Sequence, residues 1–318
     1  MSSKVKKKQV LICGATGFIG RNIAELLAES DEYDVTGTCF RRMPFRSPKI
    51  SFVQADLTDR ATVQKLLAGK DIVLHYAAKV TNLSDDRQTH AASNLIMSSH
   101  LIEAAVDQKV SHFVFPSCGY LYNSGELPFK EEDVDLNGLP REYFAMTWAK
   151  IYCERLCEGF SRQSNTKFSV LRQANVYGKY DKTNEAVAHA IPATILKAIA
   201  AENGRLEIWG DGTQRKDVLH VSDLASLVAT LLIKKQRPFD FWNVGSGEFI
   251  SMQVIAELVA RVSGKKLDVY HNTTMPSSLL YWRLDCSRAM ADLGWQPRVA
   301  IGDGIQLTYD WYRSVLRS

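Results

Sequence analysis

The chain has 318 residues, of which 46% are hydrophobic and 23% charged, and its formal net charge at pH 7 is +4. This composition predicts a globular protein with one large domain or two closely packed ones, and the small net charge argues against nucleic acid as a partner. The dense basic run at residues 4–8 precedes the first expected strand, so we interpret it as a solvated tail.

No segment that would direct the chain to a membrane is expected. The apolar run at residues 10–13 is too short for a signal-peptide core or a membrane span, and Gly14 follows it directly. We therefore expect a cytoplasmic protein without a membrane partner. The six cysteines include no CxxC pair and no cluster with histidine, which predicts reduced thiols and no metal site.

Short apolar strands alternate with amphipathic helices in the first half of the chain. The expected strands are residues 9–13, 35–40, 50–54, 72–75, 112–115 and 168–172. The expected helices are residues 21–29, 61–67, 94–108 and 147–163. Strands and helices alternating at this spacing predict an α/β fold with a Rossmann-type doubly wound parallel sheet.

The pattern changes after Tyr177. A polar segment at residues 179–185 is followed by an expected helix at residues 191–201 and a short strand at residues 206–209. The later apolar stretch at residues 241–244 has the character of a strand that rejoins the sheet.

These patterns suggest two parts with different roles. We expect residues 1–177 to form an NAD(P)-binding Rossmann domain and residues 178–318 a smaller substrate-binding region. Because no flexible linker separates them in the sequence, the parts are expected to be partly interwoven, with some of residues 215–245 on the Rossmann side.

A glycine-rich turn connects the first expected strand to the first expected helix. Glycines here permit a tight turn and a close approach of the backbone to a pyrophosphate, and the helix N-terminus presents free N–H groups to it. A turn that only packs tightly is the alternative. The cofactor-binding residues expected here are Gly14, Thr16, Gly17, Phe18, Ile19 and Gly20.

The residues after the second expected strand bear on the choice between NAD and NADP. An NAD site usually has Asp or Glu about twenty residues beyond the glycines to hold the ribose 2′-hydroxyl. This chain has Arg41 and Arg42 there, and a guanidinium can pair with a 2′-phosphate. We therefore expect NADP(H), held by Arg41. NAD(H) stays an alternative, as do arginines that only face solvent.

Two residues after the third expected strand complete this site. Asp56 is placed to accept a hydrogen bond from the adenine amine, and Leu57 is assigned to the same cofactor. The alternative for Asp56 is that it caps the helix that begins near Thr58.

Seven short motifs together resemble one family. Besides the turn at residues 14–20, they are HYAA at 75–78, NVYG at 175–178, HAIPA at 189–193, WGDG at 209–212 followed by Arg215, LHVSDL at 219–224 and NVGSG at 243–247. The chain resembles the extended short-chain dehydrogenase/reductase family, the NAD(P)-dependent epimerases and dehydratases of nucleotide sugars, over essentially its whole length. Several stretches look most like GDP-fucose synthase and related GDP-sugar C4-reductases and epimerases. The resemblance adds Ala77 to the expected cofactor-binding residues.

In that family a Ser or Thr, a Tyr and a Lys carry out the redox step. The resemblance assigns the lysine to Lys150, which would hold the nicotinamide ribose and lower the pKa of the tyrosine. The tyrosine position, four residues earlier, is Met146, and a thioether carries no proton to give or take. Counting back four from Tyr122 places the serine position at Cys118.

Other side chains are candidates for the missing proton transfer. Tyr143 lies seven residues before Lys150, close to the same helical face, with a surface or packing role as the alternative. His189 matches a family histidine that assists proton transfer at C3 and C5 of the sugar; alternatively it is structural, at the start of its helix. Tyr120 stands where the family has a partner cysteine, and Cys118 is the fourth candidate.

The resemblance also implies a substrate site. Arg215 matches an arginine that clamps the substrate diphosphate, a task that suits a planar guanidinium. At residues 275–285 the family's Pro-Asp-Gly is lost and its basic residue is shifted to Arg283. The substrate is expected to be a nucleoside-diphosphate sugar, with GDP as the nucleotide. The expected substrate-binding residues are Asn175, His189, Trp209, Arg215 and Arg283.

Two functions of different classes follow. The leading hypothesis is an enzyme that reduces or transiently oxidises C4 of a nucleotide-linked sugar with an atypical active site, as a reductase, epimerase or dehydratase. The alternative is a catalytically retired dinucleotide-binding sensor or partner protein. Family members dimerise through the helices expected at residues 94–108 and 147–163, so the resemblance also implies a homodimer.

Overall fold

The computed structural model describes residues 6–79, 87–234, 237–275 and 281–316. The start of the basic run, at residues 4–5, and residues 276–280 of the altered substrate motif lie outside the described residues. Within the described ranges, no helix is both long and apolar enough to cross a bilayer.

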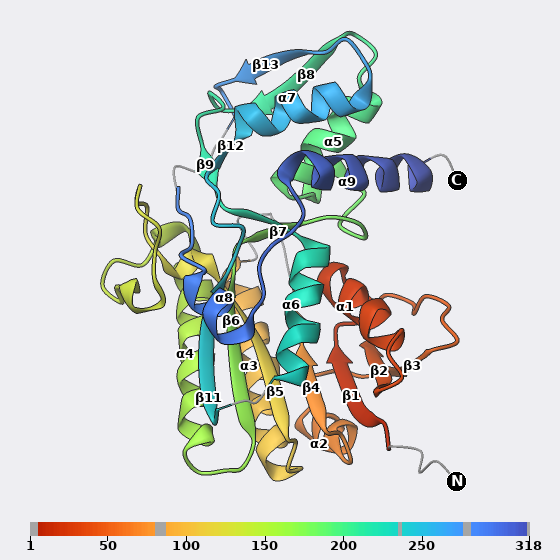
Figure 1. The fold of residues 1–318 in the computed structure, drawn as a ribbon, viewed down its shortest axis with the longest axis vertical. Coiled ribbons are helices and arrows are strands. Elements are labelled where there is room, and N and C mark those ends of the chain that lie inside the picture. The colour runs from red at the N-terminus through yellow and green to blue at the C-terminus, as the bar shows by residue number, and fades with distance from the viewer. Residues whose placement is uncertain (1–5, 80–86, 235–236, 276–280, 317–318) are drawn as a thin grey trace. The chain divides into compact units, whose positions relative to one another are not determined.

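A seven-stranded sheet with the order β11-β6-β5-β4-β1-β2-β3 forms the centre of the fold (Figure 1). Its register pairs β1 with β2 and β4, β2 with β3, and β4 with β5, all in parallel. This confirms the predicted Rossmann-type α/β fold. The strands are β1 (Lys8–Cys13), β2 (Tyr33–Cys39), β3 (Ile50–Gln54), β4 (Ile72–His75), β5 (His112–Cys118), β6 (Lys167–Gln173) and β11 (Phe239–Val244).

The central strands are buried on both faces, as parallel strands covered by helices must be. All four residues of β4 are buried, and so are the last four of β1. Leu11 and Val73 belong to a core on one face of the sheet that also contains Val63 of α2, Leu101 of α3 and Cys157 of α4. Continuous apolar runs of this kind are what made the strands recognisable in the sequence.

Helices α1 (Phe18–Ala28), α2 (Arg60–Leu67), α3 (Arg87–Asp107), α4 (Phe144–Ser161) and α6 (Val221–Ile233) accompany the sheet. Three of them begin at least three residues earlier than expected, because their first residues lack the apolar periodicity that marks their interiors. Helix α3 starts at Arg87 rather than at residue 94. Helix α1 starts inside the glycine-rich turn, at Phe18 rather than at residue 21, and α4 starts at Phe144 rather than at residue 147.

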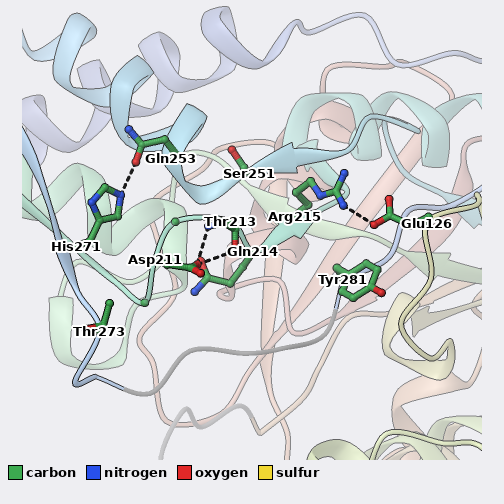
Figure 2. A pocket seen from close by; sticks show the side chains of 12 residues that line it. Glu126, Asp211, Thr213, Gln214, Arg215, Ser251, Gln253, His271, Thr273 and Tyr281 are labelled. Atoms are coloured by element: carbon green, nitrogen blue, oxygen red, sulfur yellow. Dashed lines mark hydrogen bonds and ion pairs between the residues drawn. The ribbon is translucent and has the colours of Figure 1, made fainter.

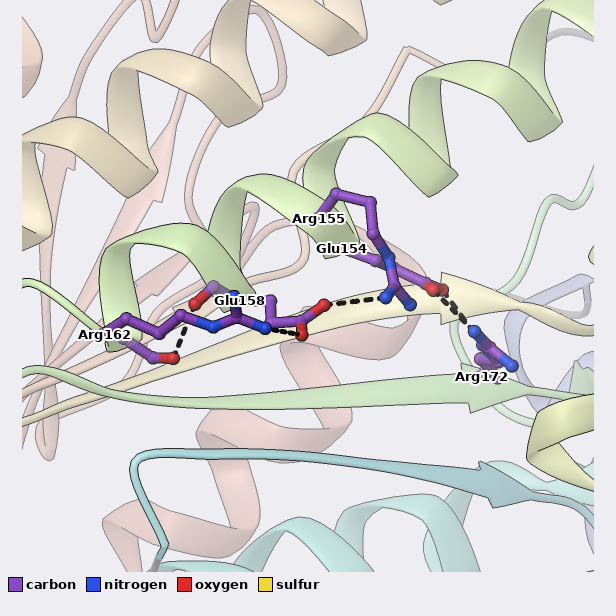
Figure 3. A network of polar contacts seen from close by, with 6 residues as sticks. Glu154, Arg155, Glu158, Arg162 and Arg172 are labelled. Carbon is purple, nitrogen blue, oxygen red and sulfur yellow. Dashed lines mark hydrogen bonds and ion pairs between the residues drawn. The ribbon is translucent and has the colours of Figure 1, made fainter.

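Helix α4 is anchored to β6 by a buried ion pair. The carboxylate of Glu154 accepts two hydrogen bonds from Arg172, at 3.1 Å from Nε and 2.7 Å from Nη2 (Figure 3). Both side chains are almost fully buried, at 1% and 3% exposed. The pair fixes α4 one turn beyond the candidate residue Lys150.

The chain divides into two compact units. The first contains residues 1–118, 141–172 and 225–242, and the second contains residues 119–140, 173–224 and 243–318. The assignment of a cofactor to one part of the chain and a substrate to the other stays a prediction.

The second unit has its own core, formed by α5, β8, α7 and α9. Its elements are β7 (Asn175–Tyr177), α5 (Ala190–Ala200), β8 (Arg205–Trp209), β9 (Arg215–Lys216), β10 (Val218–His220), β12 (Ile250–Ser251), α7 (Met252–Ser263), β13 (Asp268–Asn272), α8 (Ser287–Leu293) and α9 (Ile301–Leu316). Short parallel pairs join β7 to β10 and β8 to β13, and β9 runs antiparallel to β12. This last pair carries Arg215 opposite Ser251, the N-cap of α7.

Candidate functional site

The glycine-rich turn leaves no room for a side chain at Gly14 or Gly20. Gly14 has φ +81°, and a Cβ there would lie 2.7 Å from the Cα of Ala77. A Cβ on Gly20 would lie 2.3 Å from the carbonyl oxygen of Gly14. Thr38, which the sequence analysis did not single out, accepts a hydrogen bond from the Gly14 N–H at 2.9 Å. Glycine is therefore required at these positions for steric reasons, and Ala77 lies against the turn.

The start of α1 fits the pyrophosphate of a dinucleotide. The N-cap is Gly17, which has no side chain with which to satisfy the first N–H groups of the helix. The first N–H with a helical partner is that of Arg21, which donates to Gly17. The backbone of Phe18, Ile19 and Gly20 thus begins a helix whose positive end is open to an anion.

The structure places Arg42, rather than Arg41, against the turn. Arg42 Nη1 donates to the carbonyl oxygen of Thr16 at 3.1 Å. The guanidinium of Arg41 lies 5.6 Å from the ring centroid of Phe40. Phe40, Arg41 and Arg42 follow β2 and are all exposed. Arg42 therefore joins Arg41 as a candidate for contact with an adenosine 2′-phosphate.

Asp56 does not cap α2, so that alternative was wrong. The N-cap is Asp59, whose carboxylate accepts from the N–H of Thr62 at 2.8 Å. Asp56 instead accepts from the hydroxyl and the N–H of Thr58, at 2.6 and 2.9 Å, and these bonds lower the pKa of its carboxyl. Leu57 beside it is buried. The sequence could not separate the two aspartates, because both precede the helix by a few residues.

Lys150 of α4 extends its side chain to the carboxyl end of β5. Its ammonium donates to the carbonyl oxygen of Pro116 at 2.6 Å and lies 4.7 Å from the ring centroid of Phe115. Burial lowers the pKa of Lys150, and nearby Cys118 opposes this effect. The lysine predicted from the sequence and the candidate Cys118 therefore share one electrostatic environment.

Met146 lies one helical turn before Lys150 on α4 and is partly buried. Tyr143 is the N-cap residue of the same helix and is also partly buried. Ser117, next to Cys118, is buried, and among the described residues its hydroxyl has no hydrogen-bond partner. The three proton-bearing candidates Cys118, Tyr143 and Lys150 thus lie in the same unit as Met146, together with Ser117.

His189 in the second unit forms a pair with a carboxylate that the sequence analysis missed. It is the N-cap residue of α5, and its Nδ1 lies 3.0 Å from Oδ2 of Asp181. Asp181 is buried, whereas the His189 side chain is 45% exposed. If Nδ1 carries the hydrogen toward Asp181, Nε2 is the nitrogen left to exchange protons with a ligand. The geometry thus adds an orienting carboxylate to the candidate acid or base.

Tyr120 and Asn175 are bonded to each other. The Tyr120 hydroxyl donates to Asn175 Oδ1 at 2.9 Å, and Asn175 Nδ2 donates to the carbonyl oxygen of Asp217 at 3.3 Å. The ring of Tyr120 packs edge-on against buried Trp282, with centroids 5.5 Å apart. Both polar ends of Asn175 therefore have partners inside the second unit.

A cavity of about 1080 Å³ opens in the second unit. The loop at residues 210–214 lines it together with Arg215, Ser251 and Gln253, the end of β13, Glu126 and Tyr281 (Figure 2). At one end Arg215 and Glu126 point toward each other, and at the other His271 bonds to Gln253 at 2.7 Å. Its volume slightly exceeds the usual range for small-molecule sites, which is about 300–1,000 Å³.

The remaining predicted substrate residues lie in the second unit but outside this cavity lining, as far as the described residues show. Trp209 ends β8, is 46% exposed and has the ammonium of Lys197 5.3 Å from its ring centroid. The guanidinium of Arg283 lies 5.9 Å from the ring centroid of Phe249, the same ring that Arg215 covers at 4.4 Å.

Asp217 connects the backbone segments around this site, and the sequence analysis did not identify it. It is fully buried. Its carboxylate accepts from the N–H and hydroxyl of Ser246 at 2.8 and 2.9 Å, from Gly247 N–H at 3.2 Å and from Leu284 N–H at 3.1 Å. Asp217 thereby fixes the chain two residues after Arg215 and immediately after Arg283.

The parallel sheet and the glycine-rich turn define a dinucleotide-binding α/β protein of the Rossmann type. The chain belongs to the NAD dependent epimerase/dehydratase family, whose sequence model matches residues 10–245.

Relatives with named functions span nearly the whole chain. The GDP-L-fucose synthase of Sinorhizobium fredii is 30% identical, with 96% of each chain covered. The GDP-mannose 3,5-epimerase of Arabidopsis thaliana is 24% identical, with 96% of this chain and 82% of the relative covered. A dTDP-glucose 4,6-dehydratase of Streptomyces niveus is also 24% identical, with 96% of this chain and 93% of the relative covered.

Solved structures agree with the fold. The UDP-N-acetylglucosamine 4-epimerase of Methanobrevibacter ruminantium superposes with a TM-score of 0.86 at 23% identity, covering 98% of this chain and all of that one. The UDP-glucose 4-epimerase of Thermotoga maritima gives 0.85 at 23% identity, covering 97% and 99%. The named relatives are epimerases, dehydratases and synthases of nucleotide sugars, so the homology supports an enzyme rather than a retired scaffold.

Proposed function

We propose that the protein is an enzyme that uses NADP(H) to reduce or transiently oxidise C4 of a nucleoside-diphosphate sugar, with GDP as the nucleotide. The first unit would bind the cofactor through the turn at residues 14–20 and the second unit would bind the sugar nucleotide. Arg41 and Arg42 support NADP(H), because both follow β2 without an intervening acid and Arg42 already contacts the turn.

The observation that carries the proposal is the cavity of the second unit with Arg215 at one end. A guanidinium beside a cavity of this volume suits a nucleotide diphosphate, because its N–H groups can bond two phosphate oxygens at once. The similarity to GDP-L-fucose synthase over 96% of both chains supports GDP as the nucleotide.

The proton transfer distinguishes this active site from its family pattern. When bound, NADP(H) supplies or accepts the hydride at C4. Lys150 would hold the nicotinamide ribose and place a positive charge beside it. A proton must also leave or reach the C4 oxygen, and Met146 cannot carry it. We assign this transfer to one of Cys118, Tyr143, Tyr120 and His189.

His189 is the strongest of these candidates. Asp181 bonds to its ring and so fixes the orientation of the ring, and 45% of the side chain is exposed. Tyr120 has its hydroxyl bonded to Asn175, so it would have to release that bond to act. An imidazole held by a buried carboxylate is a usual arrangement for a general acid or base.

We further propose that the enzyme is a cytoplasmic homodimer. Phe144, Trp148 and Tyr152 lie at successive turns of α4 and are 54%, 40% and 52% exposed. Aromatic side chains repeating in this way along one face of a helix are typical of a surface that another protein covers.

Release of bound nucleotides from denatured protein, followed by mass spectrometry, tests the proposal without a choice of substrate. Tightly held NADP⁺ would support an epimerase or dehydratase that recycles its cofactor. An empty protein that binds added NADPH would support a net reductase. Recovery of NAD would contradict the roles of Arg41 and Arg42, and failure to bind either dinucleotide would contradict the enzyme proposal.

Turnover of GDP-linked sugars by the same preparation, followed by product analysis, separates an enzyme from a sensor. A protein that binds NADPH and GDP-sugars but leaves both unchanged would favour the retired scaffold.

A further inference from the structure

The arginine assigned to the substrate diphosphate already has a carboxylate partner. Arg215 Nη2 donates to Oε1 of Glu126, and the guanidinium lies over the ring of Phe249 at 4.4 Å from its centroid. Figure 2 shows the Arg215 and Glu126 side chains pointing toward each other at one end of the cavity. One edge of the guanidinium is therefore in use before any ligand arrives.

The main chain holds Glu126 in this place. The N–H of neighbouring Gly125 donates to the carbonyl oxygen of Tyr281 at 3.0 Å, and the Tyr281 N–H donates to the hydroxyl of Ser124 at 3.3 Å. A Cβ on Gly125 would lie 2.8 Å from the ring of Phe129, so this segment packs closely. The backbone that carries the Glu126 side chain is thus a fixed part of the cavity wall.

A carboxylate and a phosphate compete for the same donors. Both groups only accept hydrogen bonds, so one N–H of Arg215 cannot serve both fully. A bound diphosphate must either displace Glu126 or use the remaining N–H groups beside a like charge. Both routes weaken binding. Because the side chains of Arg215 and Glu126 are 42% and 62% exposed, the ion pair is weak enough for a ligand to displace.

We propose that Glu126 is an internal competitor that limits the affinity of the cavity for nucleotide diphosphates by occupying Arg215. This inference rests on the proposed function, because it takes the Arg215 guanidinium as the diphosphate ligand. It assigns a role to a residue in the segment at residues 119–140, which belongs to the second unit although it lies between two segments of the first.

The test is calorimetric titration of the full chain with GDP, UDP and inorganic pyrophosphate at low and high ionic strength. Glu126→Gln keeps the shape of the side chain and removes its charge. We expect this variant to bind GDP about two- to fivefold more tightly than the wild type at low ionic strength, with a smaller gain at high ionic strength. Glu202→Gln, which removes the same charge from an exposed position outside the cavity lining, should leave the affinity unchanged.

Arg215→Met tests the diphosphate role of Arg215 separately from the competing role of Glu126. We expect Arg215→Met to weaken binding, and we expect Glu126→Gln to give no further gain in the Arg215→Met background. If Arg215→Met binds as well as the wild type, or if none of the probes binds either the wild type or Glu126→Gln, the diphosphate assignment and the inference both fail. Only the inference fails if Arg215→Met weakens binding but Glu126→Gln does not raise the affinity for GDP. The same holds if Glu126→Gln raises the affinity equally in the Arg215→Met background.

Discussion

Replacement of Asp217 by asparagine should change how the stability of the protein depends on pH. The carboxylate is fully buried, and burial raises the pKa of Asp217 to about 6 from an ordinary value of 3.8, although four donors bond to it. A raised native pKa means that the contribution of this group to stability is fully present below about pH 3.8 and is lost as the pH rises through about 6.

The size of this effect follows from the change in pKa. The difference between 6 and 3.8 is 2.2 pH units, and each of these corresponds to about 1.36 kcal/mol, so the wild type should lose about 3 kcal/mol of unfolding free energy over this range because of Asp217. The asparagine side chain of the variant does not titrate. The amide NH₂ of asparagine also faces backbone N–H groups that then lose their acceptor. Each unpaired group destabilises the variant by about 1–3 kcal/mol, and this cost does not depend on pH.

Urea unfolding followed by tryptophan fluorescence, from about pH 4 to about pH 7, measures both quantities. The excess stability of the wild type over Asp217→Asn should shrink as the pH rises. Glu202→Gln controls for the loss of one negative charge and should run parallel to the wild type. A difference that stays constant, or that grows with pH, would refute the reasoning, because it would mean that the four donors outweigh burial and hold the carboxyl ionised.

Four further predictions concern single substitutions. His189→Asn should lower kcat about a hundred- to ten-thousand-fold, whether the enzyme reacts at C4 or at another ring carbon of the sugar, with little change in cofactor binding. Retention of full activity would show that His189 takes no part in the mechanism. Met146→Tyr should raise the rate of sugar reduction by about tenfold or more, as measured by NADPH consumption, whereas a loss of native activity would show that methionine belongs to the mechanism. Glu154→Ala should cost about 3–5 kcal/mol in urea unfolding because it removes the carboxylate that balances the buried charge of Arg172. Glu158→Ala, which breaks only partly exposed pairs, should cost less than about 1 kcal/mol. Trp148→Asp should convert a dimer to a monomer in light scattering, and a wild type that is already monomeric at micromolar concentration would contradict the proposed assembly.

The sheet could be predicted because its signals are local. Buried parallel strands appear as continuous apolar runs, and the one at residues 72–75 was located to the residue. The edge strand at residues 50–54 was also located to the residue, although most of it is exposed. The glycine-rich turn is also local, since φ +81° at Gly14 and the crowding at Gly20 depend on a few neighbouring residues. Helix starts were less accurate, because the first turn of a helix has no periodicity of its own.

The polar contacts of the second unit could not be predicted in this way. Asp217 accepts from Ser246, Gly247 and Leu284, which are far from it in the sequence, and no spacing rule connects them. The same holds for Glu126 and Arg215, which are 89 residues apart. The partner of His189, Asp181, lies only eight residues away, but in an irregular segment whose path the sequence does not define.

If Met146 stands in place of the catalytic tyrosine, as we propose, the replacement removes a smaller part of catalysis than the place of tyrosine in the family motif suggests. A general acid or base contributes about a hundred- to ten-thousand-fold, or about 3–5 kcal/mol, whereas enzymes lower barriers by about 8–23 kcal/mol in total. The rest comes from holding the reactants in position and from charges arranged around them. The groups that would position the reactants and supply charge are present. They are the open N-terminus of α1, Lys150 with its pKa lowered by burial, and Arg215 beside the cavity. Met146 therefore predicts an enzyme with a changed or slower proton transfer, and only the loss of these other groups as well would predict a scaffold without chemistry.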